Sequence, residues 1–137
     1  MEYVAGLLFS DEGDRVALIL KNRPAWQAGK FNAIGGKIEL NETPEAAMRR
    51  EFIEEANVDA TWQFRFTLGN PGLWGVHFFS CYSSAAMADL QTMTDEPIEV
   101  IEIHALPENL IPNLRWIIPL LLDPTVVVPH YIVDAQS

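Results

Sequence analysis

The sequence predicts a mixed α/β domain, and three observations lead to this fold class. Short apolar segments typical of strands lie on both sides of one helix-like segment at 44–56. A second helix-like segment, at 113–122, follows the last long strand. Turn-forming residues separate these segments, and 137 residues are enough for one hydrophobic core. Such an order favours a mixed sheet with helices on its faces. We therefore expect a single domain over residues 1–137.

The individual strands are predicted where runs of aliphatic, β-branched or aromatic residues end at turn-forming residues. This criterion gives strands at 3–10, 15–21, 31–34, 61–69, 73–83 and 98–104, with a further late strand at 126–133. The segment 84–94 fits either a loop or a short helical turn. After the third strand, Gly35-Gly36 is expected to form a turn. Pro119 is expected to interrupt or kink the second helix, because proline has no backbone N–H to donate.

The helix predicted at 44–56 has recognisable signals at both ends. Thr43 suits the N-cap, Pro44 fits the first helical position, and Glu45 favours the positive end of the helix dipole. Good helix formers continue to Ala56. Asn57 follows, and asparagine readily adopts the left-handed conformation that ends many helices. The helix is therefore expected to begin and end at defined residues.

Three carboxylates on this helix are spaced to share one face. Glu51, Glu54 and Glu55 stand at i, i+3 and i+4, and Arg50 lies four residues before Glu54. Like charges at these spacings repel unless a cation lies among them. Magnesium and manganese prefer oxygen ligands, so a divalent metal site is one interpretation. A solvated acidic surface is the alternative.

The spacing of these residues resembles the Nudix box, G-x5-E-x7-R-E-U-x-E-E-x-G-U, in which U is a bulky apolar residue. Gly36, Glu42, the Arg50-Glu51-Phe52 triplet and the pair Glu54-Glu55 occupy the matching positions. Val58 matches the final apolar position, whereas Asn57 replaces the last glycine. Asparagine is well able to replace glycine at positive φ, so the loop geometry is expected to be kept. The resemblance covers 23 residues, disfavours the solvated surface, and implies an α/β/α sandwich with a mixed central sheet.

The resemblance also assigns roles around the expected metal. It implies metal ligands at Glu51, Glu54, Glu55 and the Gly35 carbonyl, an orienting arginine at Arg50, and an outer supporting carboxylate at Glu42. Nudix enzymes hydrolyse nucleoside diphosphates linked to another group, using water and divalent metal. Mg²⁺ is the expected cofactor, with Mn²⁺ as the alternative. Glu51 is the expected general base; a carboxylate outside the box is the alternative, and Glu96 is the candidate because it precedes a strand that would return it to the metal.

Sequence outside the box resembles the MutT-like oxidised-purine nucleoside triphosphatases. Residues 29–37, GKFNAIGGK, and 112–121, PNLRWIIPLL, carry this resemblance, which implies base contacts at Asn32 and Asn113. An amide offers both a donor and an acceptor, which suits a purine edge. Trp26, Phe31 or Trp116 is expected to offer a stacking surface, although for Trp116 a core position is favoured. Asn32 has the alternative of satisfying backbone groups, and Asn113 that of capping the helix. Lys37 is expected either to be exposed or to contact a phosphate.

Composition excludes several other classes of function. The net charge of −10 argues against a nucleic acid polymer as partner, but a metal ion still allows a single nucleotide to bind. The apolar runs are short and the first residues lack a basic region, so neither a membrane span nor a signal peptide is expected. Cys81 is the single cysteine, which fits a reducing, cytoplasmic location, and it is expected to be a small buried filler in a strand. A monomer and a homodimer both remain open.

These observations lead to a functional hypothesis. The chain is expected to be a metal-dependent nucleoside triphosphate pyrophosphohydrolase that acts on 8-oxo-dGTP or a related purine nucleotide. One alternative is Nudix hydrolysis of ADP-ribose, a dinucleoside polyphosphate or a pyrimidine triphosphate. Another is a non-catalytic nucleotide-binding module, which is disfavoured because such modules usually lose the box carboxylates.

Overall fold

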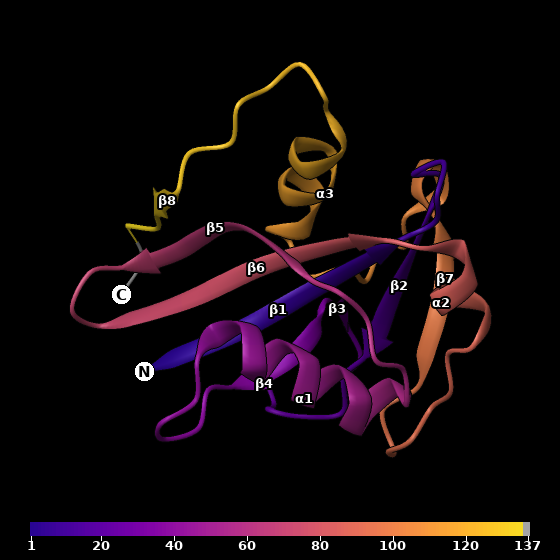
Figure 1. Cartoon of the computed structure of the whole chain (residues 1–137), viewed down its shortest axis with the longest axis horizontal. Helices are drawn as coiled ribbons and strands as arrows, with labels where there is room; N and C mark the ends of the chain where they lie inside the picture. Colours follow the sequence, from indigo (N-terminus) through magenta and orange to yellow (C-terminus); the bar gives the residue numbers. More distant parts are fainter. Residues whose placement is uncertain (136–137) are drawn as a thin grey trace.

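A computed structural model describes residues 1–135 of the chain (Figure 1). The strands are β1 (Glu2–Phe9), β2 (Arg15–Leu20), β3 (Phe31–Asn32), β4 (Ile34–Lys37), β5 (Gln63–Asn70), β6 (Trp74–Tyr82), β7 (Ile98–Glu102) and β8 (Tyr131–Val133). The helices are α1 (Pro44–Ala56), α2 (Ser84–Ala88) and α3 (Leu114–Leu122), with a 3₁₀ turn at Ile103–Ala105. The single domain over residues 1–137 stays a prediction, because its last two residues lie outside the described part.

The strands form one mixed sheet, as predicted. Six of the described strands follow the order β3-β2-β1-β6-β5-β8, while β4 pairs with β1 and β7 pairs with β2. The β1–β6 and β5–β8 pairs are parallel, and the remaining pairs are antiparallel. The sheet is therefore neither a simple meander nor a doubly wound parallel sheet.

The central strands β1 and β2 pair over only a short stretch and then separate. Their register joins Leu8 to Ala17 and Phe9 to Val16, after which β3 continues the pairing of β2 and β4 that of β1. The chain at 31–37 therefore fills the space between two diverging strands. This arrangement leads directly into the loop before α1, which carries the acidic residues.

Helices cover both faces of the sheet (Figure 1). On one face α1 buries Ala47, Met48 and Phe52 against side chains of β1 and β6 such as Leu8 and Phe79. On the other face α3 buries residues that include Leu114 and Ile117 against the opposite side of the same strands. The two apolar clusters make the α/β/α sandwich, with α1 fixed rigidly to the sheet.

The ends of α1 agree with the signals in the sequence. The Thr43 hydroxyl accepts a hydrogen bond from the Ala46 N–H at 3.1 Å, and Pro44 occupies the first turn. Asn57 adopts the left-handed conformation, with φ 58° and ψ 33°, and its N–H donates to the Ile53 carbonyl. Asparagine thus performs the backbone role of the glycine that it replaces.

Several predicted elements were wrong in extent. The predicted strand at 31–34 is two strands, and Gly35 and Gly36 lie inside β4 instead of forming a turn. The late strand is confined to 131–133. The segment 84–94 contains the short helix α2, which confirms the helical one of its two predicted alternatives. Pro119 lies inside α3 without ending it, since the helix continues to Leu122. Within residues 1–135, no helix has the length and apolar character needed to cross a bilayer.

Candidate active site

The acidic cluster is organised by Arg50, which extends from α1 towards the preceding loop. Its Nε and Nη2 donate to both oxygens of Glu42, at 2.7 and 2.9 Å. Its Nη1 donates to Glu51 Oε1 at 2.9 Å and lies 3.4 Å from Glu54 Oε2. The guanidinium also donates to the Lys37 carbonyl at 3.1 Å. One planar side chain therefore holds the loop and two box carboxylates in a fixed arrangement.

Glu42 occupies the outer position that the resemblance implied for it. Hydrogen bonds from Arg50, and a further one from the Glu39 N–H, lower the pKa of the Glu42 carboxyl to about 2. The same contacts raise the pKa of the Arg50 guanidinium. Both groups are therefore charged at neutral pH, and the Glu42 carboxylate is bound by Arg50 through both of its oxygens.

Gly36 allows the Glu51 carboxylate to approach β4 closely. A Cβ added at Gly36 would lie 2.5 Å from the Glu51 carboxyl carbon, a distance that real atoms do not adopt. A larger residue at this position would therefore have to displace the Glu51 carboxylate from the place it occupies beside β4. Gly35, whose carbonyl is the predicted backbone ligand, directly precedes it in β4.

Glu55 is the most strongly perturbed carboxyl group of the cluster. Burial, followed by the neighbouring charge of Glu51, raises its pKa to about 8. Lys21 and Glu96 also lie close enough to act on it electrostatically. Its Oε2 is buried and has no hydrogen-bond partner within residues 1–135. A buried carboxylate oxygen without a partner is costly, so this atom requires either a proton or a cation.

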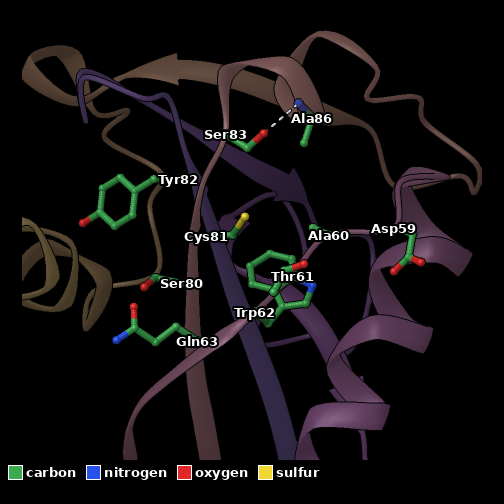
Figure 2. A pocket seen from close by; sticks show the side chains of 10 residues that line it. All are labelled: Asp59, Ala60, Thr61, Trp62, Gln63, Ser80, Cys81, Tyr82, Ser83 and Ala86. Carbon is green, nitrogen blue, oxygen red and sulfur yellow. Dashed lines mark hydrogen bonds between the residues drawn. The ribbon is translucent and has the colours of Figure 1, made fainter.

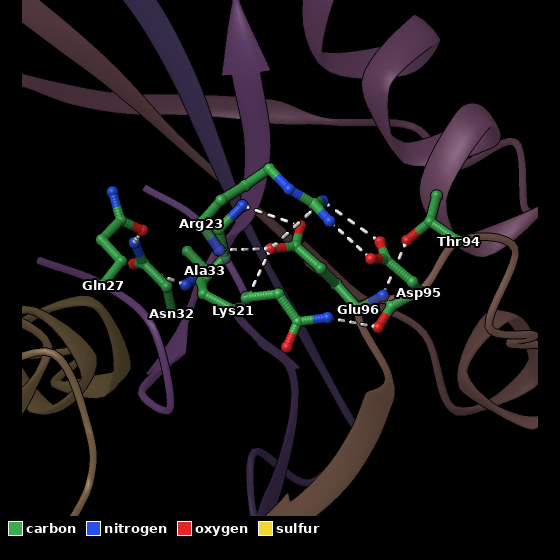
Figure 3. Close-up of polar contacts among 9 residues, drawn as sticks. Lys21, Arg23, Gln27, Asn32, Ala33, Thr94, Asp95 and Glu96 are labelled. Atoms are coloured by element: carbon green, nitrogen blue, oxygen red, sulfur yellow. Dashed lines mark hydrogen bonds and ion pairs between the residues drawn. The ribbon is translucent and has the colours of Figure 1, made fainter. Parts of the chain in front are cut away.

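Glu96 binds Lys21 and anchors the segment 21–23 (Figure 3). Its Oε1 accepts from Lys21 Nζ at 2.9 Å, and its Oε2 accepts from the Asn22 N–H at 2.6 Å. Burial alone would raise the pKa of Glu96, but the Asn22 N–H and the Lys21 amine outweigh it and lower the pKa. Both Glu96 oxygens are thus engaged by residues 21–23, and its predicted place at a metal stays a prediction.

The donor set fits a divalent cation at Glu51 and Glu55. The two carboxylates are neighbours, one has an unpartnered buried oxygen, and hard cations prefer such oxygen donors. Glu54 differs from them, because 57% of its side chain is exposed and its carboxylate is directed to Arg50. Among the described residues, no three carboxylate, histidine or cysteine side chains already surround one point as ion ligands. The predicted convergence of three glutamates is therefore, in this structure, a convergence of two.

The predicted base contacts lie on other segments of the chain. Asn32 is half-buried in β3, where its Oδ1 accepts from the Ala33 N–H and its Nδ2 donates to Gln27 Oε1. Asn113 stands at the start of α3, yet its side chain makes no capping hydrogen bond there. In the described part of the chain its Oδ1 is buried without a partner. The capping alternative for Asn113 is therefore wrong, and its buried acceptor is left without a partner among the described residues.

Chain pairing brings these two asparagines to the same region. Phe31, beside Asn32, bridges Leu110, and the Ile111 N–H donates to the Phe31 carbonyl at 2.9 Å. The Trp26 ring is 64% exposed on the loop before β3. Trp116 is 42% exposed and its ring lies 6.4 Å from that of Phe66, so the predicted core position was wrong. Two aromatic side chains are thus accessible near the segments that carry the asparagines.

Two residues of this region were missed by sequence reasoning. Lys21 joins Glu96 to the surroundings of Glu55, and Gln27 fixes Asn32 (Figure 3). Neither lies in a motif, and no spacing rule connects position 21 to position 96, so only the folded chain reveals them. The Lys37 side chain, expected to be exposed or to contact phosphate, is exposed, and its carbonyl supports Arg50.

A cavity of about 530 Å³ lies elsewhere on the molecule, between the start of β5, the end of β6 and α2 (Figure 2). Its walls include Trp62, Gln63, Cys81 and Tyr82. None of the predicted site residues lines it. The chemistry of its side chains therefore marks the acidic cluster as the candidate site.

Comparison with known proteins agrees with this geometry. The NUDIX domain profile matches residues 2–121. Two similar proteins are the oxidized purine nucleoside triphosphate hydrolases of Danio rerio, 39% identical over 72 residues, and Mus musculus, 40% identical over 73 residues. These alignments cover 47% and 48% of this chain and 45% and 46% of the relatives. The chain therefore matches about half the length of these two relatives.

Solved structures show the same fold. A MutT NUDIX hydrolase from Burkholderia pseudomallei superposes with a TM-score of 0.72 at 19% identity, covering 86% of this chain and 95% of that one. A MutT protein from Bacillus halodurans gives a TM-score of 0.72 at 18% identity, covering 96% and 87%. At such low identity the likeness extends to the arrangement of the sheet and helices.

Proposed function

The chain belongs to the Nudix family, and from this premise we propose that it is a nucleoside triphosphate pyrophosphohydrolase. The observation that carries the proposal is the buried, unpartnered Oε2 of Glu55 beside Glu51, on a helix fixed by Arg50. Such a pair of carboxylates is suited to a divalent cation, and Mg²⁺ is proposed over Mn²⁺. The bound ion would neutralise the phosphate oxygens and make an attached water more acidic.

The residues of the chain divide the remaining work. Glu51, held at Oε1 by Arg50, accepts a proton from the attacking water. The water oxygen attacks the β-phosphorus, and the bond between that phosphorus and the oxygen bridging to the α-phosphate breaks. The products are a nucleoside monophosphate and pyrophosphate. Glu42 and Arg50 keep the Glu51 carboxylate oriented during the proton transfer. The anchored Glu96 is the alternative proton acceptor.

The proposed substrate is an oxidised purine nucleotide such as 8-oxo-dGTP. Support comes from the similar oxidized purine nucleoside triphosphate hydrolases and from Asn113, whose buried Oδ1 lacks a partner within residues 1–135. An orphan amide oxygen suits a ring N–H of the base, and the exposed Trp26 ring suits stacking. The role that follows is cleaning of the nucleotide pool, with a free nucleotide and not a nucleic acid polymer as the partner.

A pyrophosphate-release screen tests the proposal. Wild-type protein and Glu55→Gln are compared with Mg²⁺ on natural and oxidised nucleoside triphosphates and on ADP-ribose. We expect wild type to release pyrophosphate fastest from an oxidised purine, and the variant to lose this activity. AMP released faster from ADP-ribose would contradict the substrate, and no release from any triphosphate would overturn the reaction.

A further inference from the structure

The Asn32 side-chain amide is held at both of its ends. Its Oδ1 accepts from the Ala33 N–H at 2.8 Å, and its Nδ2 donates to Gln27 Oε1 at 2.9 Å. Both bonds are partly buried. An amide that is free to rotate by half a turn offers a donor or an acceptor at either position, whereas this one is fixed.

The direction of the amide is dictated by a backbone group. The Ala33 N–H can only donate, so the oxygen of Asn32 must face it, and the nitrogen must face Gln27. Gln27 then presents its own oxygen to Asn32. The backbone of β3 therefore sets the polarity of two successive side-chain amides, and the second bond keeps the first amide from swinging away.

Gln27 is itself positioned by the loop before β3 (Figure 3). Its N–H donates to the Pro24 carbonyl at 2.9 Å, and its carbonyl accepts from the Lys30 N–H at 3.0 Å. The base of this loop is closed by the Lys21 N–H donating to the Lys30 carbonyl, and by the Gly29 N–H donating to the Lys21 carbonyl. The glutamine thus projects from a closed loop whose first residue, Lys21, also binds Glu96.

We propose that Gln27 is a specificity-determining positioning residue, which orients the Asn32 amide for reading the nucleobase. This inference rests on the proposed function. After its two internal bonds, Asn32 retains one N–H and one lone pair of Oδ1 at fixed places. Oxidation at C8 of a purine converts the acceptor N7 into an N–H donor and adds an oxygen. Only an amide that is fixed in one orientation distinguishes a donor from an acceptor at N7. The residue that fixes it, Gln27, is therefore part of the selectivity for an oxidised purine.

Two substitutions at Gln27 distinguish the effect of its Oε1 acceptor from that of the rest of the side chain. Gln27→Leu removes the acceptor, and we expect the ratio of kcat/KM for 8-oxo-dGTP to that for dGTP to fall by about two- to tenfold. Gln27→Glu keeps an acceptor for Asn32. The ratio of the two kcat/KM values is therefore expected to stay at its wild-type value, even where the added negative charge slows the hydrolysis of both triphosphates. Gln63→Leu makes the same change at an exposed glutamine in β5 and should leave the ratio unchanged.

The orientation of Asn32 is measured without substrate by NMR of its side-chain amide, identified from the signals lost in Asn32→Leu. The proton bonded to Gln27 should move to the position of a free amide in Gln27→Leu and stay in place in Gln27→Glu. A wild-type enzyme that prefers the oxidised base, with an unchanged ratio in Gln27→Leu, would overturn the inference alone. A wild type that hydrolyses no triphosphate overturns the proposed function and the selectivity role together. If the Asn32 amide signal in Gln27→Leu also stays at its wild-type position, Gln27 does not position Asn32.

Discussion

The two ends of the proposed site are a phosphate end, formed by α1 and the loop before it, and a base end, formed by β3 and the start of α3. They are built by different physical means. At the phosphate end, Arg50 joins carboxylates from α1 and the preceding loop, and Glu55 is left with a buried oxygen that lacks a partner in the described chain. At the base end, neutral amides lie at Asn32 in β3 and at Asn113 just before α3, and exposed aromatic rings lie on nearby segments. Charge organises the first end, and the direction of hydrogen bonds organises the second.

This difference predicts that the two ends fail in different ways. Loss of a charged group at the phosphate end should affect every nucleotide alike, because all of them carry the same phosphates. Loss of an amide at the base end should alter the preference among nucleotides with little effect on the reaction itself. The following substitutions test that separation, from the largest expected effect to the smallest.

The largest effect is expected for Glu51→Gln. The substitution keeps the shape of the side chain but removes the proton acceptor, so kcat should fall by about 10²- to 10⁴-fold for oxidised and unmodified substrates alike. Steady-state kinetics measure it, with Glu45→Gln as the control, since Glu45 is exposed in the first turn of the same helix. Equal activity in the two variants would remove Glu51 from the reaction.

The adjacent arginines allow a matched comparison at the same end. Arg50→Lys keeps the positive charge but cannot donate to Glu42 and Glu51 together, so we expect kcat to fall by up to about 10²-fold. The melting temperature should fall by about 4–8 °C. Arg49→Lys is the control, because Arg49 forms an exposed ion pair with Asp59 at 2.7 Å. Similar losses in both variants would contradict the central role of Arg50.

A smaller and more selective effect is expected for Asn113→Leu. The change removes a buried acceptor that has no partner within residues 1–135, so the melting temperature should not fall. The preference for an oxidised purine over dGTP should fall by about two- to tenfold, as measured by the ratio of kcat/KM values. An unchanged ratio together with reduced stability would restore a purely structural role for this residue.

The smallest effect concerns acid stability. The folded protein lowers the pKa of Glu42 from 4.5 to about 2, so its contribution to stability is present above pH 4.5 and is lost as the pH falls towards 2. Melting curves should therefore show Glu42→Gln destabilised most above pH 4.5 and converging with wild type below it. Asn113→Leu alters an uncharged group and should show no such convergence. A difference for Glu42→Gln that is independent of pH would contradict this linkage.

The same comparison explains how much the sequence could predict. The phosphate end lies within 23 consecutive residues, where helical spacing alone places Arg50 within reach of Glu54, and capping signals define α1. The resemblance to a known motif then supplied the role of Glu42. Gly36 was matched by the motif, but the close approach of the Glu51 carboxylate to it follows from the packing of α1 on β4.

The base end could be predicted only in part. Asn32 and Asn113 were found by resemblance, but Gln27 and Lys21 act through contacts formed by the folded loop, which no spacing rule describes. Trp116 was expected in the core because its helical spacing with Leu120 is typical of a buried face. Its 42% exposure arises because α3 packs on the sheet through Leu114, Ile117, Ile118 and Leu121 instead, a face that tertiary packing selects. Partners far apart in sequence are therefore the features that were missed.

The most direct test of the central claim is whether Mg²⁺ stabilises the protein through Glu55. Thermal unfolding is recorded for wild type, Glu55→Gln and Asn113→Leu with increasing MgCl₂ and with EDTA. An ion bound by the folded state raises the melting temperature, so wild type and Asn113→Leu should show a rise that saturates, and Glu55→Gln should show none. An equal rise in Glu55→Gln, or no rise in wild type, would contradict a cation site at the two carboxylates.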